Sequence, residues 1–344
     1  MGLHPSFKLR ERHTPELLEL LDAAVLGTNG AHYRHLDTAE KLEEVDKPLH
    51  LTFERNNKPT GNVTFCRRDQ HWYVRYFAFS SAFQSSGKKK SKVKQSGFLK
   101  KELNTFFENA FNGEHAETPV DSFYAYIDPN NEKSLWMSET FGFETIGKVA
   151  TQTYSRIRPK PSERLVEIND VEEVRTMVEE KFSQYQFYFD AHIFNSPMYG
   201  LKDENGEIIA FAKMSKAEWE IKRLPRRMGR VLVKIIPFIP GLNKLIRPKC
   251  HSFLVPEAVI AKNNDPQLLD ELFQAILNSQ KEHLMIWWVD EKNHLYSTVK
   301  SKVKWGLLNK LIGVNQAHVV QRHNPTTKLS ASNTPIYTSG IDFI

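Results

Sequence analysis

The sequence of 344 residues has few cysteines and no long apolar run. Cys66 and Cys250 form no Cys-x-x-Cys pair, and no cysteine and histidine stand at zinc-ligand spacing, which argues against a disulfide framework and a structural metal. No stretch reaches the length of a membrane span, and Met1–Arg12 lacks the apolar core of a signal peptide. These absences predict a cytoplasmic protein without a bound metal.

The balance of charge is positive, with 47 Lys and Arg against 41 Asp and Glu. A surface of this sign attracts phosphates, whether they belong to a nucleotide cofactor, nucleic acid or anionic lipid, and charge alone does not choose among them. The hydrophobic content of 40% is enough to bury two cores. We therefore expect two domains of about 150 to 180 residues each.

In the first half, the spacing of apolar residues predicts the order strand, helix, hairpin, central strand, helix, strand, helix, strand. The second helix is expected from Phe98 onward, because its apolar residues from Leu99 to Phe111 fall on one helical face. The elements are expected at residues 7–10, 15–26, 49–54 with 61–67, 72–79, 98–111, 123–127, 132–140 and 143–154.

Two prolines between residues 156 and 163 suit a linker, and after them the same order begins again. We therefore predict domains at residues 1–157 and 158–344, the second with an insertion at residues 219–249. The elements of the second half are expected at residues 165–168, 171–182, 198–202 with 207–214, 251–261, 267–277 and 284–289.

Matching short motifs occur at equivalent places in the two halves. A buried strand ends in Asp128 followed by Asn131, and another ends in Asp290 followed by Asn293. Phe141-Gly142-Phe143 then corresponds to Trp305-Gly306-Leu307. This pattern favours a duplicated fold over chance.

The element order, with an Asn-led helix that ends in an aromatic-Gly-Phe corner, resembles the GNAT superfamily of N-acyltransferases. Asn131, Ser134 and Gly142-Phe143 stand at the spacing of that superfamily's helix before its closing strands. The resemblance covers nearly all of residues 1–155 and, more faintly, residues 163–344. It implies an α/β fold of the α+β mixed-sheet kind, with two GNAT-like domains in tandem.

The superfamily binds its acyl-CoA donor where a strand splays from its neighbour before a Gln/Arg-x-x-Gly-x-Gly/Ala turn that opens a helix. Bare backbone N–H groups at such a helix start bind pyrophosphate, and glycine lets the backbone come close. In this chain the resemblance makes Phe79-Ser80-Ser81 the splayed strand end and Gln84–Lys89 the turn. An alternative helix start is Ser96-Gly97, and Lys88–Lys94 is either a solvated loop or a contact to cofactor phosphates. The resemblance implies binding of acetyl-CoA or a longer acyl-CoA by Phe79, Ser80, Gln84, Ser85, Ser86, Gly87, Lys88, Lys89, Ser96, Gly97 and Asn131.

No catalytic residue is assigned from the sequence. Many GNAT enzymes carry a tyrosine acid four residues before the Gly-Phe corner, where this chain has Ser138, a poor acid for a leaving thiolate. Trp136 nearby is expected in the core. In the second domain, residues 262–266 contain no glycine and one acid, so we do not expect coenzyme A there.

The insertion is basic and apolar, and no acidic residue occurs from Ile221 to Pro256. Two interpretations stay open: a helical lid with solvated bases, or a segment, residues 221–249, that contacts an anionic membrane or an acyl chain. Its basic residues are Lys222, Arg223, Arg226, Arg227, Arg230, Lys234, Lys244, Arg247 and Lys249.

These observations predict an N-acyltransferase that moves an acyl group from acyl-CoA to an amine by direct attack, with a lipid-linked or long-chain substrate as one version. The alternative is a non-catalytic tandem GNAT protein that binds a ligand or a membrane. Nucleic acid is not expected as a partner, because the basic run lacks interleaved aromatic residues. The expected location is the cytoplasm, with peripheral attachment to the inner face of the membrane as an extension.

Overall fold

The computed structural model describes residues 3–27, 31–45, 47–79, 89–116, 118–195, 197–224, 229–327 and 333–344. The chain forms two compact units, each made of three segments that are separate in the sequence. Unit 1 comprises Met1–Leu26, Thr38–Ile146 and His318–Ala331, and unit 2 comprises Gly27–Asp37, Gly147–Ala317 and Ser332–Ile344. The domain boundary after residue 157 stays a prediction, and the compact units divide the chain differently.

Unit 1 contains a mixed sheet in the order β1-β3-β4-β5-β6-β13. All neighbours are antiparallel except β5 and β6, which are parallel. The predicted hairpin is confirmed, and its turn places Asn56 and Asn57 at positive φ, which asparagine tolerates well. The strands are β1 (Phe7–Arg10), β3 (Pro48–Arg55), β4 (Lys58–Cys66), β5 (His71–Phe79), β6 (Ser122–Ile127) and, from His318 on, β13 (Asn315–His323).

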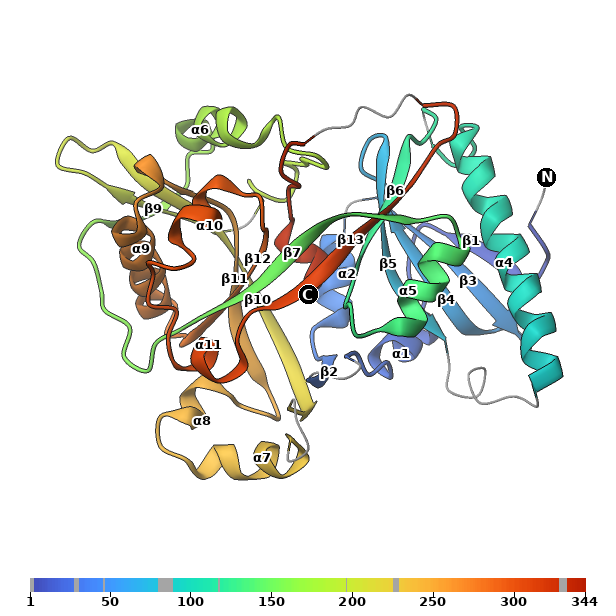
Figure 1. Cartoon of the computed structure of the whole chain (residues 1–344), viewed down its shortest axis with the longest axis horizontal. Helices are drawn as coiled ribbons and strands as arrows, with labels where there is room; N and C mark the ends of the chain where they lie inside the picture. The colour runs from blue at the N-terminus through green and yellow to red at the C-terminus, as the bar shows by residue number, and fades with distance from the viewer. Residues whose placement is uncertain are drawn as a thin grey trace. The chain divides into compact units, whose positions relative to one another are not determined.

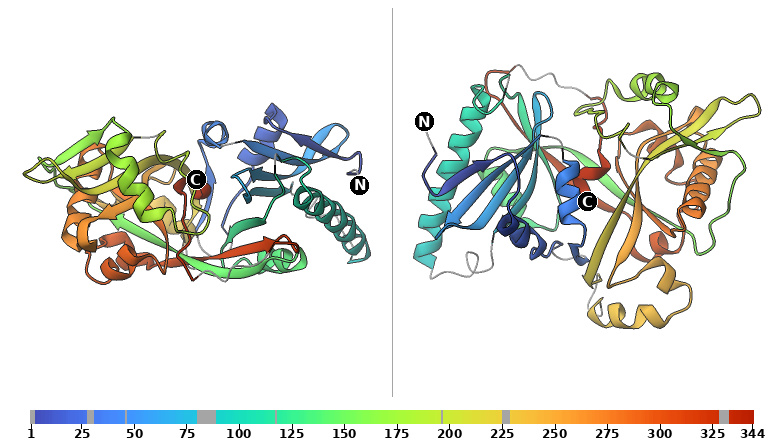
Figure 2. Two further views of the ribbon diagram at one scale, coloured as in Figure 1. Left: turned by 90° about the horizontal axis from the view of Figure 1, so that it is seen from above. Right: turned by 180° about the vertical axis from the view of Figure 1, so that it is seen from behind.

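The helices of unit 1 cover both faces of this sheet, with α1 and α4 on opposite sides (Figure 2). The predicted apolar face of α4 is confirmed, because Leu103, Phe106 and Phe107 are buried against the sheet residues Phe65 and Phe123. Burying such aromatic residues supplies most of the stabilisation of this core. The helices are α1 (Pro15–Asp22), α2 (Thr38–Glu44), α4 (Lys89–Phe111) and α5 (Glu132–Thr140).

Helix α4 begins at Lys89, earlier than the expected start at Phe98. Gly97 therefore lies inside the helix, where a side chain would meet nothing within 4 Å. One glycine costs a helix only about 1 kcal/mol, and the packed face that follows outweighs that cost. The alternative helix start at Ser96-Gly97 is thus wrong.

The strands of unit 2 also have a mixed arrangement, in the order β7-β12-β11-β10-β9-β8, with β2 paired to β10 (Figure 1). Only β11 and β12 are parallel; the other pairs are antiparallel. A mixed sheet in the second half is what the duplicated fold requires. The strands are β2 (His32–His35), β7 (Glu144–Ser155, from Gly147 on), β8 (Leu165–Ile168), β9 (Met198–Lys202), β10 (Ile208–Arg223), β11 (His251–Ala261) and β12 (Leu284–Asp290).

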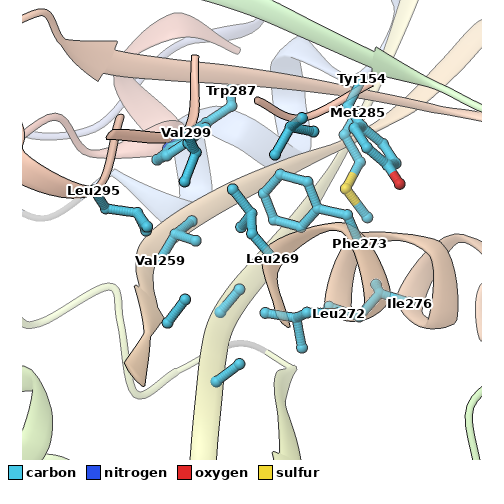
Figure 3. Packing of buried hydrophobic residues seen from close by; sticks show 14 of the residues in the cluster. Tyr154, Val259, Leu269, Leu272, Phe273, Ile276, Met285, Trp287, Leu295 and Val299 are labelled. Carbon is cyan, nitrogen blue, oxygen red and sulfur yellow. The ribbon is translucent and has the colours of Figure 1, made fainter. Parts of the chain in front are cut away.

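The core of unit 2 lies between this sheet and α9, as Figure 3 shows. Leu269, Leu272, Phe273 and Ile276 recur at helical spacing on α9 and are fully buried. Asp265 caps the helix by accepting a hydrogen bond from Gln267 N at 2.8 Å. The helices are α6 (Glu172–Phe182), α7 (Gly229–Ile235), η1 (Ile236–Phe238), α8 (Leu242–Leu245), η2 (Lys262–Asn264), α9 (Pro266–Ser279), α10 (His294–Val299), α11 (Leu307–Ile312) and η3 (Gly340–Phe343).

The predicted insertion starts later than expected. Strand β10 continues to Arg223, so Trp219 belongs to the sheet and not to the insertion. Its indole stacks on Tyr33 of β2, with ring centroids 3.9 Å apart. Pairing with β2 extends β10, and neither the stacking nor the pairing can be seen from the local sequence.

Of the paired sequence motifs, the two Asp-x-x-Asn motifs make the same hydrogen bonds in both units. The predicted match of the aromatic-Gly motifs is wrong, because Gly142-Phe143 leads into strand β7 whereas Gly306 caps helix α11. Asp128 accepts a hydrogen bond from Asn130 N at 2.8 Å, and Asp290 accepts one from Lys292 N at 2.7 Å. Asn131 then caps α5 and Asn293 caps α10, with accepted bonds of 3.1 and 3.0 Å. The two motifs therefore make the same strand-to-helix turn.

Candidate functional site

The candidate site lies in unit 1, where β5 and β6 part. Their parallel pairing runs only from His71 opposite Ser122 to Tyr73 opposite Tyr124. Further along β5, Tyr76 has a φ of 50°, which breaks the regular strand. A cavity of about 240 Å³ opens beside this divergence.

The cavity is apolar inside and polar at one side. Side chains from six elements, β4, β5, β6, β13, α4 and α5, make the apolar part, together with Phe143 just before β7. They include Val63, Leu103, Phe107, Ala125 and Val320. Asp128 and the first turn of α5 make the polar part, through Asn131 and Ser134. The helix start carries partial positive charge, but the Asp128 carboxylate beside it opposes an anion, so this side favours a neutral carbonyl group next to an apolar one.

A buried polar cluster holds the irregular part of β5 in place. The Asn62 amide donates to Tyr76 O at 3.1 Å and to Thr64 Oγ1 at 2.9 Å, and His50 Nδ1 lies 2.9 Å from the same hydroxyl. Burial lowers the pKa of His50 to about 4, with a smaller contribution from His13. His50 is therefore neutral at neutral pH.

Three polar residues of β5, Tyr73, Arg75 and Tyr76, line the cavity and were not singled out from the sequence. The rings of Tyr73 and Tyr124 lie 5.3 Å apart. Arg75 is buried, and its guanidinium lies 4.3 Å from the ring centroid of Tyr76, within range of a cation–π interaction. In the sequence, the alternating aromatic residues of this strand were the only feature that pointed to these residues, and they indicated a central strand rather than a site.

The predicted cofactor-binding residues are distributed as follows. Phe79 ends β5, Lys89 begins α4, and Asn131 caps α5 and lines the cavity. Ser80, Gln84, Ser85, Ser86, Gly87 and Lys88 lie outside the described residues. Ser96 and Gly97 lie within α4, and Gly97 does not line the cavity. The assignment of all these residues to a cofactor stays a prediction.

Two side chains of α5 have distinct environments. Ser138 lines the cavity, but its hydroxyl donates to Leu135 O at 2.8 Å, as serines in helices often do. Trp136 is 60% exposed, so its expected place in the core is wrong. A nine-residue helix buries only one stripe, and Trp136 lies off that stripe.

The corresponding divergence in unit 2 is filled by the chain itself. Strands β11 and β12 pair only at Leu254 and Met285, and residues 333–344 occupy the space beyond. Ile336 N donates to Asp290 at 2.6 Å, and Thr338 donates to Trp288 O at 2.8 Å. The remaining cavity measures about 20 Å³.

Glu257 anchors this filling segment. Its carboxylate accepts hydrogen bonds from Tyr337 OH at 2.8 Å and Gly340 N at 3.0 Å, and it forms a buried ion pair with Lys213 at 3.0 Å. Burial opposes the charge of Glu257, but Lys213 and Tyr337 outweigh it, so the pKa of Glu257 is lowered. The carboxylate of Glu257 is therefore fully paired by Lys213 and by residues 333–344, and it does not face an open site.

No known protein family and no curated protein matches this sequence. Solved structures do match it. N-myristoyltransferase of Saccharomyces cerevisiae with bound myristoyl-CoA aligns at a TM-score of 0.57 and 9% identity, over 98% of this chain and 90% of that chain. A tandem GNAT protein from the clavulanic acid biosynthesis pathway aligns at 0.52 and 9%, over 94% and 100%.

A GCN5-related N-acetyltransferase from Sphaerobacter thermophilus aligns at a TM-score of 0.51 and 11% identity, over 96% of this chain and 100% of that chain. The chain has the tandem GNAT fold. The predicted fold class is thereby confirmed. Because identities near 10% establish the fold alone, the activity of this chain has to be argued from its site. No helix within the described ranges is long and apolar enough to cross a bilayer.

Proposed function

We propose that the protein is an acyl-CoA-dependent N-acyltransferase whose donor site is the cavity of unit 1. The observation that carries the proposal is an apolar cavity at the divergence of two parallel strands, next to the start of α5. The likeness to a structure with bound myristoyl-CoA supports a long acyl chain as the apolar group. The predicted Gln84–Lys89 turn would then hold the pyrophosphate, because α4 begins at its last residue.

The reaction we propose is direct transfer. A neutral amine attacks the thioester carbonyl, its nitrogen loses a proton, and the coenzyme A thiolate leaves and takes up a proton. In this proposal Ser138 is not the acid, because its hydroxyl is committed to Leu135 O. Tyr73 and Tyr76 bring phenols to the cavity and are the candidates to test.

The decisive experiment compares donors of different length. Ala125 lies opposite Val320 in the β6–β13 register, and both line the cavity. In Ala125→Phe, the added ring would exclude about three methylenes of a long chain, each worth about 0.8 kcal/mol when buried. We expect calorimetry to show roughly 60-fold weaker binding of myristoyl-CoA and little change for acetyl-CoA.

Val320→Ala is the matched control, because it widens the same cavity and should not weaken myristoyl-CoA binding. Equal losses for both donors in Ala125→Phe, or no loss for either, would contradict a chain-binding cavity. Thermal unfolding of both variants shows whether weaker binding comes from the changed cavity or from loss of folded protein.

The alternative is a tandem GNAT protein that binds its ligand without catalysis, which the committed hydroxyl of Ser138 favours. Mass spectrometry of the ligand retained by the purified protein tests binding. Release of free thiol from a bound acyl-CoA in the presence of a panel of amines then tests transfer. Tight binding with no amine-dependent thiol release supports the alternative.

A further inference from the structure

The insertion of unit 2, residues 229–249, exposes a group of apolar side chains. Phe238 is 84% exposed, Val231 46% and Ile235 45%, with Leu232 close behind at 38%. In contrast, Ile236, Leu245 and Ile246 are buried and fasten the segment to the unit. The apolar residues of the insertion are therefore divided between anchoring it and facing outward.

The same segment also carries exposed cations. Arg230, Lys234, Lys244, Arg247 and Lys249 are all exposed. In the described part of the chain, none of the five makes an ion pair, and the neighbouring Glu220 is already paired with Lys222 and Arg34. The insertion itself contains no acidic residue. Its charge is therefore available to an anionic partner.

The insertion also stands apart within its unit. In Figures 1 and 2, α7 and α8 lie beyond one end of β10 and β11, whereas α6 lies at the other end of unit 2. The helices are short, with seven and four residues, and Pro237 and Pro240 interrupt the segment between them. Such a segment suits a position in the plane of a surface.

We propose that residues 229–249 dock the protein on an anionic membrane surface, with Phe238, Val231 and Ile235 entering the headgroup region and the five cations contacting lipid phosphates. Nucleic acid could bind the cations, but the exposed apolar side chains would add nothing to that binding. A lipid surface can bind both groups, so it is the better partner. This inference does not depend on the proposed acyl transfer.

The test uses the full-length protein and sedimentation with two kinds of vesicle: pure phosphatidylcholine, and phosphatidylcholine with about one-third phosphatidylglycerol. We expect binding to the anionic vesicles only. Each lipid-facing cation contributes about fivefold to partitioning, so the triple variant Arg230→Gln, Lys234→Gln, Lys244→Gln should bind roughly 100-fold more weakly. Phe238→Ala should bind roughly tenfold more weakly at both low and high salt.

Two matched controls keep the test specific. Lys300→Gln, Lys302→Gln, Lys304→Gln removes three exposed charges of the same unit outside the insertion. Trp136→Ala removes another exposed aromatic side chain, from unit 1. Both should bind as the intact protein does.

Two vesicle results would overturn the inference: no binding of the intact protein to anionic vesicles, or equal binding by the insertion variants and the controls. A third would be binding to a DNA oligonucleotide as tight as binding to the anionic vesicles, with the same affinity for DNA in Phe238→Ala. The last result would identify the insertion as a polyanion site. Because Phe238 and the cations are exposed, the variants should keep the thermal midpoint of the intact protein, which checks that they fold.

Discussion

Acidification should destabilise unit 1 through His50, which lies in the polar cluster behind the candidate site. Its side chain is fully buried, and burial lowers its pKa from the ordinary value of 6.5 to about 4. Because the folded pKa lies below the unfolded one, the unfolded chain binds a proton more readily. Stability is therefore complete above pH 6.5 and is lost as the pH falls towards 4.

The two values determine the size of this effect. Integrating proton binding from pH 8 to pH 5 gives a loss of about 2 kcal/mol in the free energy of unfolding. The variant His50→Gln cannot take up the proton and should lack this contribution. The assay is urea unfolding of the intact protein and of the variant at pH 8, 6.5 and 5. His294→Gln, at an exposed position on α10, is the control and should follow the intact protein.

The quantity to compare is the difference in unfolding free energy between the intact protein and His50→Gln. It should shrink by about 2 kcal/mol between pH 8 and pH 5. A difference that stays constant over this range would mean that His50 titrates alike in the folded and unfolded chain. The burial argument would then be refuted.

Three further predictions concern single positions. His251 is buried in unit 2 with a pKa lowered to about 4, so His251→Gln should remove a second acid-sensitive contribution of the same sign in the same urea assay. At Gly97 on α4 an added side chain would meet nothing within 4 Å, so Gly97→Ala should raise the free energy of unfolding by about 0.5–1 kcal/mol. Calorimetry should show unchanged coenzyme A binding by Gly97→Ala and weaker binding by Gly87→Leu. Gly340→Val should lower the free energy of unfolding by about 1–3 kcal/mol in thermal unfolding, because a Cβ there would lie 2.7 Å from Val255; an unchanged midpoint would contradict close packing of residues 333–344.

The sequence alone was enough where structure depends on neighbouring residues. The paired asparagines at 56 and 57 indicated the β3–β4 hairpin, and the Asn131 cap indicated α5 with its observed bounds. Strand β11 likewise matches its expected bounds, because its mostly apolar residues favour a buried strand. Turn chemistry and capping act within a few residues, so they are readable without a tertiary structure.

Prediction failed where distant partners decide the outcome. Strands β2 and β13 are short or polar at their ends and exist because they pair with β10 and β6. Gly97 suggested a helix start, yet packing further along α4 carries the helix through it. Trp136 suggested a core residue, yet α5 presents a different stripe to the sheet. In each case long-range packing outweighed a local preference of about 1 kcal/mol or less.

In the candidate site, too, some features follow from the local sequence and others from packing between distant residues. The sequence by itself determined the Asp128–Asn131 turn. The phosphate-binding segment at Gln84–Lys89, which the resemblance to the GNAT superfamily implies, stays a prediction. Only the tertiary structure decided that Val63, Phe107 and Val320 from separate elements enclose a cavity in unit 1. It also decided that residues 333–344 fill the matching divergence in unit 2. The physical reason is that a cavity is space left over when distant side chains pack, and no local pattern in the sequence encodes that volume.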